Sequence, residues 1–397
     1  EVLRREMRQA EGAWISTTAI ERSKTRLERL AFFDEINVET PAVPGTNDQV
    51  DVNFTVKEKP AGNLLLGAGF SQAQGIVIQT SITQENFAGS GNRASFAFNN
   101  SRVNRNFSFS WFNPYWTDDG ISRGLEAFYR KTDAFEANLA DYNLDELGAG
   151  ISFGVPISEF NTVNFGATIE NTKFKPGDTA SNEVVAFRNE VGEEYNTLTL
   201  GVSHTNDTRD NRLLPNRGQL TRISADLAVP GLDLSFYKLR LLHQRVLPLF
   251  KDFALALEGD VGYGDGYGST RDLPLTKNYF AGGLRSVRGF EANTLGPRDS
   301  NGEPLGGSVK LVGNAELIIP LPFVTNTRSF RLTAFLDGGN VYGPGEDVDL
   351  ETIRYSTGIS AVWLSPLGPM TVSIAVPLKE EPGDETQPFQ FTFGTTF

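Results

Sequence analysis

The chain contains no cysteine among its 397 residues, and only two histidines, His204 and His243. Without cysteine, neither a disulfide nor a thiolate metal site can form, and the redox compartment cannot be inferred. Two isolated histidines offer little for metal binding or acid–base catalysis, and no nucleophile beside a base can be identified. We therefore expect no enzyme active site, no catalytic residues, no metal and no cofactor.

Long apolar runs and excess positive charge are also missing. The formal net charge is -13, which disfavours binding to nucleic acid. No stretch approaches the ~20 apolar residues that a membrane helix needs. Barrel strands, however, alternate apolar and polar residues and escape such a search. The 40 glycines and 29 phenylalanines combine turn formers with aromatics, so the composition does not exclude a membrane β-barrel.

Residues 1–59 differ from the rest of the chain. Their hydrophobic spacing and turn signals predict two helices followed by two strands. The predicted elements are 2–9, 17–30, 32–40 and 50–58. The chain begins at Glu1, without methionine or a signal peptide, so we expect a mature or trimmed chain.

After Pro60, alternating runs of about ten residues recur, which is the length of a tilted membrane strand. We expect sixteen strands, an even number as in single-chain bacterial barrels. They lie near 61–70, 74–84, 92–101, 105–112, 122–132, 145–154, 161–172, 195–206, 217–229, 234–247, 252–263, 308–320, 328–340, 354–364, 369–378 and 389–397. One set of connections is mostly short and the other includes the long segments 173–194 and 264–307. The sequence thus predicts an all-β membrane protein, a 16-stranded antiparallel transmembrane β-barrel over 60–397 behind a small α+β domain.

A soluble β-sandwich or β-propeller is the alternative fold. Such a protein would not need so many outward aromatic residues along its strands. The segments also lack the internal repeat of a propeller. Both observations favour the membrane barrel.

The segment Gly282–Phe290 carries Arg288 between Val287 and Gly289. A guanidinium inside a barrel is costly unless it is paired with an acid. Glu316 and Asp337 alternate with apolar residues on their strands, so both acids are expected to face inward, since an acid facing lipid is costly. An ion pair that only locks the fold and one with an active role remain equally open.

The C-terminal run ends on Phe397 and alternates Phe389, Phe391 and Phe393 with polar residues. Gly394 could kink this last strand and leave its edge groups unpaired. The first strand, 62–70, is rich in glycine, which also suggests weak packing. An open edge could pair with an incoming strand by β-augmentation.

These motifs together resemble the BamA family of outer-membrane assembly proteins over the whole chain. Residues 1–59 resemble its barrel-proximal POTRA domain, without that domain's first strand, so we expect an incomplete domain. The motif Val287-Arg288-Gly289-Phe290, preceded by 279–283, resembles the sixth extracellular loop, which folds into the barrel. The resemblance implies that Arg288 contacts Glu316 and Asp337. It also implies that the last strand, with its β-signal ending at Phe397, forms a weak seam with the first.

The family's properties imply the function and the partners. The chain is expected in the bacterial outer membrane with the POTRA domain in the periplasm, where it would fold and insert β-barrel proteins. Expected partners are nascent outer-membrane proteins, outer-membrane lipid and periplasmic lipoproteins docking on the POTRA domain. Arg4, Arg5 and Glu6 are candidate lipoprotein contacts, although ordinary surface charge explains them equally well. The alternatives are a two-partner secretion or translocation-assembly transporter and, less favoured, a passive porin.

Overall fold

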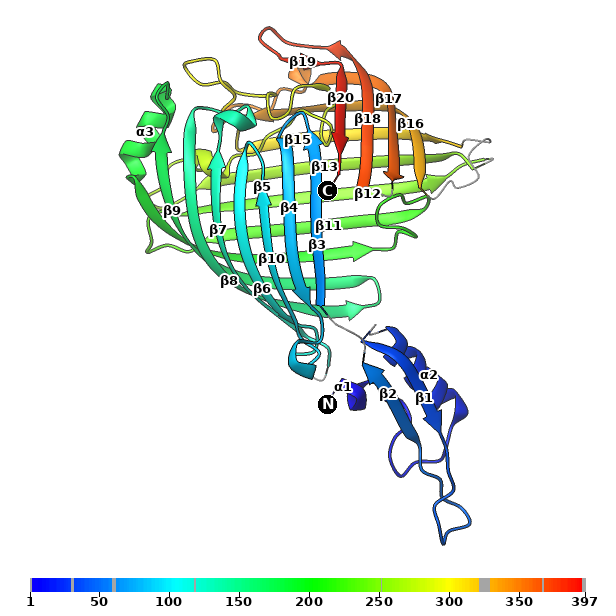
Figure 1. The fold of residues 1–397 in the computed structure, drawn as a ribbon. Coiled ribbons are helices and arrows are strands. Elements are labelled where there is room, and N and C mark those ends of the chain that lie inside the picture. Colours follow the sequence, from blue (N-terminus) through cyan, green and yellow to red (C-terminus); the bar gives the residue numbers. More distant parts are fainter. Residues whose placement is uncertain are drawn as a thin grey trace.

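The computed structural model places a small N-terminal α+β unit below one end of a large β-barrel (Figure 1). It describes residues 2–29, 32–58, 62–117, 119–250, 252–320, 329–365 and 368–394. No helix within these ranges is both long and apolar enough to cross a membrane.

The N-terminal unit has the predicted order of two helices and two strands. Its elements are α1 (Val2–Glu6), α2 (Thr17–Arg29), β1 (Phe33–Glu39) and β2 (Asn53–Glu58), and the two strands pair antiparallel. α2 begins after Ser16, whose Oγ accepts the Ala19 N–H at 3.3 Å as an N-cap. α1 ends three residues earlier than predicted. There, the Arg8 N–H leaves helical bonding and donates to Ser23 Oγ on α2 at 2.7 Å.

The predicted sixteen-stranded antiparallel barrel is confirmed. Its strands are β3 (Gly62–Ser71), β4 (Gly75–Gln84), β5 (Arg93–Asn100), β6 (Asn104–Asn113), β7 (Ser122–Asp133), β8 (Tyr142–Ser158), β9 (Asn161–Pro176), β10 (Glu194–Asp207), β11 (Gly218–Ala228), β12 (Phe236–Pro248), β13 (Ala254–Gly266), β15 (Val309–Ile319), β16 (Phe330–Tyr342), β17 (Arg354–Ser365), β18 (Gly368–Lys379) and β20 (Phe389–Phe393). Each strand pairs with its neighbours in sequence, and β20 closes the barrel on β3.

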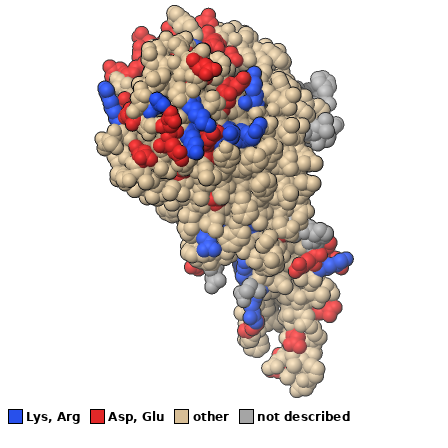
Figure 2. All heavy atoms as spheres, turned by 60° about the vertical axis from the view of Figure 1, so that its left-hand side comes forward, with Lys and Arg blue, Asp and Glu red and all other residues tan. Residues whose placement is uncertain are grey.

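The two faces of the barrel wall differ in chemistry, as the alternation predicts. Large apolar side chains such as Leu66, Ile76 and Ile374 are exposed on the outside, whereas Asp260, Asp337 and other charged side chains are buried. Figure 2 shows, on the face that it draws, a nearly uncharged band of the barrel wall below a densely charged distal end. This distribution matches a hydrocarbon belt flanked by water.

We call the end of the barrel nearest the N-terminal unit the proximal rim and the opposite end the distal rim. Most proximal connections within the described ranges are short, whereas the distal rim carries the long segments after β9 and β13 (Figure 1). The β9–β10 connection, expected to be irregular, contains helix α3 (Asn182–Val191). Its N-cap is Ser181, whose Oγ accepts the Val184 N–H at 3.4 Å.

A hydrophobic cluster covers the distal part of the barrel. It joins α3 and the ends of several strands to the segment after β13, through residues including Phe174, Val184, Tyr195 and Leu275. This cluster explains why β8 begins before its predicted start and β9 continues past its predicted end, because Leu144 and Phe174 continue the wall into it as fully or nearly fully buried side chains. We refer to it as the distal cluster.

Candidate functional site: an anchored loop and a short seam

The segment between β13 and β15 returns to the inner barrel wall through Arg288. Its Nε and Nη2 donate to the two carboxylate oxygens of Asp337, each at 2.7 Å, and its backbone N–H donates to Asp337 Oδ2 at 3.1 Å. Its Nη1 lies 2.6 Å from Glu316 Oε1. The structure thus brings Arg288 against both acids on β15 and β16, in the forked geometry that a guanidinium favours.

The surroundings of Arg288 keep it charged and rigid. Its side chain is 7% exposed and that of Asp337 is fully buried. Burial alone would lower the pKa of Arg288, but the hydrogen bonds to Asp337 and the charge of Glu316 raise the pKa above its usual range. The guanidinium carbon also lies 3.6 Å from the ring centroid of Phe335 on β16, as in a cation–π contact.

The residues flanking Arg288 pack against the same wall. Val287 and Phe290 are fully buried in a cluster with Val312 and Val341 of β15 and β16. Gly289 has a φ of +89°, and a Cβ there would lie 3.0 Å from Ala375 Cβ on β18. The backbone conformation and the close packing both favour glycine at this position.

The loop also holds the region of the last strand. β14 (Gly289–Phe290) pairs with β19 (Thr386–Gln387), which lies just before β20. Gln390 on β20 donates from Nε2 to the Phe290 carbonyl at 2.8 Å, and its Oε1 accepts the Gly289 N–H at 3.4 Å. The sequence reasoning did not single out Gln390, although its inward phase between Phe389 and Phe391 was a usable signal.

Within the described residues, the seam between β20 and β3 is shorter than every other pairing in the barrel. Its register contains two pairs, Thr392 with Ser71 and Phe393 with Phe70, whereas β18 pairs with β17 from Tyr355 to Ser365. Across the described residues, β3 therefore has no strand partner on its seam side from Gly62 to Gly69. A long stretch of backbone edge is left open to pairing.

Gly394 ends the described part of the seam. Its φ is +88°, and a Cβ there would lie 2.6 Å from Gly69 Cα on β3. Its N–H donates to Pro369 O at 2.9 Å, so the chain remains attached to β18 at this point. Of the phenylalanines expected in the terminal signal, Phe391 stacks on Phe70 with ring centroids 6.4 Å apart, Phe389 is exposed, and Phe393 pairs with Phe70. Phe397 lies outside the described residues.

The three residues proposed for a lipoprotein contact have different environments. Glu6 is buried, with its carboxylate 2.7 Å from the Arg26 guanidinium of α2. Arg5 lies over the Tyr115 ring of the β6–β7 turn, with 4.4 Å between the guanidinium carbon and the ring centroid. Only Arg4 is largely exposed, in a pair with exposed Glu11. The accessible charge on this helix is therefore that of Arg4.

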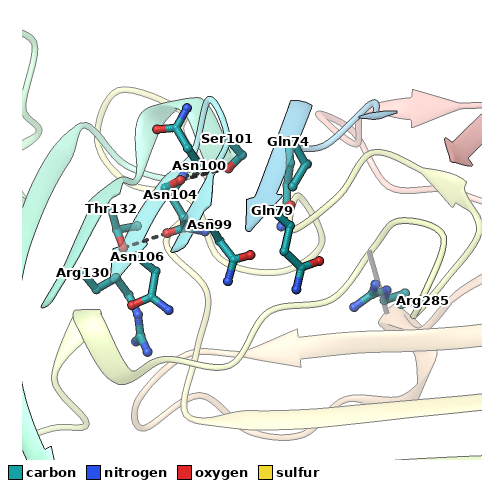
Figure 3. A pocket seen from close by; sticks show the side chains of 11 residues that line it. Gln74, Gln79, Asn99, Asn100, Ser101, Asn104, Asn106, Arg130, Thr132 and Arg285 are labelled. Carbon is teal, nitrogen blue, oxygen red and sulfur yellow. Dashed lines mark hydrogen bonds between the residues drawn. The ribbon is translucent and has the colours of Figure 1, made fainter. Parts of the chain in front are cut away.

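The barrel interior beside the first strands is hydrophilic. A cavity of about 480 Å³ is lined mainly by amide side chains of β4–β6 and the adjoining turns, with Arg285 on its far side (Figure 3). The amides belong to Gln74, Gln79, Asn99, Asn100, Asn104 and Asn106. No cluster of three or more potential metal ligands occurs among the described residues.

Comparison with known proteins identifies the family. Residues 86–397 match the Omp85 superfamily domain, and residues 1–59 match the POTRA family described as a surface antigen variable number repeat. The chain is 37% identical to the outer membrane protein assembly factor BamA of Neisseria meningitidis serogroup B, over 100% of this chain and 55% of that relative. It is 27% identical to the sorting and assembly machinery component 50 homolog of Mus musculus, over 91% and 79% of the two chains.

Solved structures give the same result. BamA from Haemophilus ducreyi lacking POTRA domains 1–3 superposes with a TM-score of 0.92 at 29% identity, covering 100% of this chain and 81% of that one. CdiB from Acinetobacter baumannii gives 0.61 at 14% identity, over 98% and 69%, which is a likeness of fold alone. The chain spans about half the length of the bacterial BamA relatives that it matches. It is an outer-membrane β-barrel of the Omp85 superfamily, similar to BamA.

Proposed function

We propose that this chain folds and inserts β-barrel proteins into the outer membrane, and that the short seam between β3 and β20 is its working surface. The observation that carries the proposal is the register of the seam, in which Thr392–Ser71 and Phe393–Phe70 are the only two pairs among the described residues. The relative from Neisseria meningitidis is named as an outer membrane protein assembly factor. The same role fits a barrel whose first strand keeps a free edge.

The open edge of β3 offers a template. On the seam side, the backbone N–H and C=O groups of β3 from Gly62 to Gly69 have no strand partner among the described residues. An incoming strand can pair with these groups. In lipid, each unpaired backbone group is costly, so every new hydrogen bond favours further pairing. Folding of the substrate supplies the free energy, and no bond-making chemistry or cofactor is needed.

The loop would keep the rest of the wall fixed while the seam opens. Arg288 joins the loop to β15 and β16, and Gln390 joins the same loop to β20. The anchor thus lies on the β20 side of the seam. We infer that β20 stays with the loop and that β3 presents the free edge.

We assign residues 1–59 to the incomplete POTRA domain and 60–397 to the barrel, with the inward loop at about 264–307. The proximal rim then faces the periplasm and the distal rim the exterior, which agrees with the short proximal turns. Periplasmic lipoproteins would dock on the POTRA domain, with Arg4 as the exposed contact. A charge reversal there, Arg4→Glu, should reduce co-purification of such a partner. Equal recovery with and without the reversal would argue against that contact.

Two other functions are less well supported. A passive porin needs an open lumen, whereas Arg288 anchors a loop to the inner wall of this one and the distal cluster covers its distal part. A polypeptide transporter of the two-partner secretion or translocation-assembly type would need a continuous path through the same lumen. The anchored loop argues against both functions.

A disulfide across the seam tests the proposal. Ser71→Cys with Thr392→Cys places two cysteines directly opposite each other. The chain has no native cysteine, so the bond formed is unambiguous.

The oxidised double variant should lose assembly of a model barrel substrate in reconstituted vesicles, and a reductant should restore it. Ser95→Cys with Ser110→Cys, which face each other on β5 and β6, is the matched control and should remain active when oxidised. Full assembly by the seam-locked protein would rule out insertion through the seam.

A further inference from the structure

The short turn between β3 and β4 places Gln72 beside the edge of β20. Gln72 is the first residue after β3 ends at Ser71. Its Nε2 donates to the Phe389 carbonyl at 3.2 Å, and its Oε1 accepts the Phe391 N–H at 2.9 Å. One side-chain amide therefore engages two backbone groups of the last strand.

These two backbone groups belong to the seam edge of β20. The Pro388 carbonyl accepts the Ala375 N–H of β18. Along a strand, the backbone N–H and C=O groups of successive residues point to opposite sides, so those of Phe389 and Phe391 point toward β3. The register of Ser71 with Thr392, continued by one step, would set Gln72 opposite Phe391. The chain instead turns toward β4, where the Gln74 N–H donates to Ser71 O at 3.3 Å.

The Gln72 amide thus supplies the donor and acceptor that a longer β3 would have supplied. We propose that Gln72 is the latch of the seam: it holds the edge of β20 at Phe389 and Phe391 to β3, and an incoming polypeptide strand displaces it. The second half of this inference rests on the proposed function in insertion. A peptide backbone carries the same pair of groups as the amide, so displacement exchanges two hydrogen bonds for two similar ones.

A side-chain latch has a property that further backbone pairing would lack. The amide can leave β20 by rotation about its own side-chain bonds, while Phe70 and Ser71 stay in register. The seam can therefore expose two edge groups of β20 without separating the strands. We expect this step to precede full opening.

Hydrogen exchange of the full chain in lipid nanodiscs, without substrate, tests the latch. In Gln72→Ala, the backbone amide of Phe391 should exchange about tenfold faster than in the wild type, because its acceptor is removed. Gln72→Glu keeps an acceptor but loses the donor to Phe389, so its exchange should be intermediate.

Gln74→Ala is the matched control. Gln74 lies in the same turn, and its side chain lines the lumen cavity. Its side-chain amide has no hydrogen-bond partner in the described part of the chain. This variant should leave exchange at Phe391 unchanged. If the Gln72→Ala and Gln74→Ala variants both exchange like the wild type, Gln72 is not a latch.

Assembly in vesicles tests displacement separately. Gln72→Ala should capture a model barrel substrate several-fold faster than Gln74→Ala, because no latch has to be displaced. Faster exchange at Phe391 together with equal capture rates would overturn displacement during insertion. Assembly by the Ser71–Thr392 disulfide form would overturn the proposed function instead, and it would leave the exchange result untouched.

Discussion

Arg288 is a buried cation whose cost is offset by two acids and an aromatic ring. Replacing it with alanine leaves the fully buried Asp337 carboxylate without its counter-ion. We expect Arg288→Ala to destabilise the barrel by about 3–5 kcal/mol, because an unpaired buried charge is strongly unfavourable. Urea unfolding, followed by tryptophan fluorescence in detergent, measures the change.

Arg285 provides the control for this variant. It lies in the same loop, but its side chain faces the lumen cavity and has no ion-pair partner among the described residues. Arg285→Ala should therefore unfold close to the wild-type urea concentration. Arg288→Lys keeps the charge but loses the fork, so its stability should fall between the two. Equal stability of all variants would mean that the ion pair does not hold the loop.

Gly394 tests the geometry of the seam at one residue. Gly394→Ala combines a left-handed backbone with a Cβ 2.6 Å from Gly69 Cα, so we expect a cost of about 1–3 kcal/mol. The strain should loosen the seam and slow formation of the Ser71–Thr392 disulfide on oxidation.

Gly383→Ala is the comparison for this prediction. Gly383 has a similar φ of +93°, but an added Cβ there would meet no atom within 4 Å. Its backbone strain is therefore similar without the clash. Slowing in both variants would assign the effect to backbone strain and not to the close approach at the seam.

The positions of single residues were predictable from the sequence where their charge, or their place in the inward–outward alternation of a strand, constrained them. Glu316 and Asp337 could be placed because an acid facing lipid is costly, which fixes the inward phase of their strands. Arg288 could be placed because a guanidinium inside a barrel needs an acidic partner. Gln72 could not be found in the same way. A neutral amide does not carry the cost of a charge that faces lipid. Its hydrogen-bond partners depend on the residue at which the turn leaves the paired strands.

The pairing of β14 with β19 is a small element whose stability we expect to depend on pH. The Glu291 N–H donates to Glu385 O at 2.8 Å, which brings two carboxylates to the same contact. Burial raises the pKa of Glu291, and the nearby Glu385 raises this pKa further. A raised folded pKa favours the protonated acid, so its stabilising contribution is full at pH values below the ordinary glutamate pKa. The contribution is lost as pH rises through the raised pKa.

We therefore expect the contact between β14 and β19 to be looser at neutral pH than under acidic conditions. Glu291→Gln should remove this dependence and slow hydrogen exchange of the backbone amides of residues 385–387 a few-fold at neutral pH. Glu380→Gln, on the exposed part of the β18–β20 connection, serves as the control and should change nothing. Faster exchange in Glu291→Gln would contradict the assigned cause.

At the scale of elements, period-two alternation located all sixteen barrel strands, because each strand separates an apolar outside from a polar inside. Three features escaped the pattern. α3 lies in a segment expected to be a loop, β14 and β19 have two residues each, and the described part of β20 ends at Phe393. These features depend on packing in the distal cluster and on the seam, which no local pattern encodes.

The whole barrel should conduct ions poorly despite its size. The distal cluster packs Val184 of α3 together with the segment after β13, and Arg288 anchors that segment to the inner wall. In planar bilayers, the wild-type protein should show much smaller steady conductance than an open-lumen barrel of similar strand number. A large stable conductance would contradict a closed distal end.

Val184→Asp tests which element closes the distal end. Val184 is fully buried and Val185, its neighbour, is 41% exposed, so a charge at Val184 should unseat α3 and raise the conductance. Val185→Asp places the same charge on the surface and should conduct like the wild type. Identical traces from both variants would show that α3 is not the closing element.

The strands also differ in length around the circumference. β8 has 17 residues, whereas β3 has 10 and the described part of β20 has 5. At about 3.4 Å per residue and a tilt of about 40°, β3 spans about 26 Å. This height falls short of a hydrocarbon core of about 30 Å. Lipid beside the seam must therefore thin to match the wall, and hydrophobic mismatch would weaken the bilayer where a new strand has to enter.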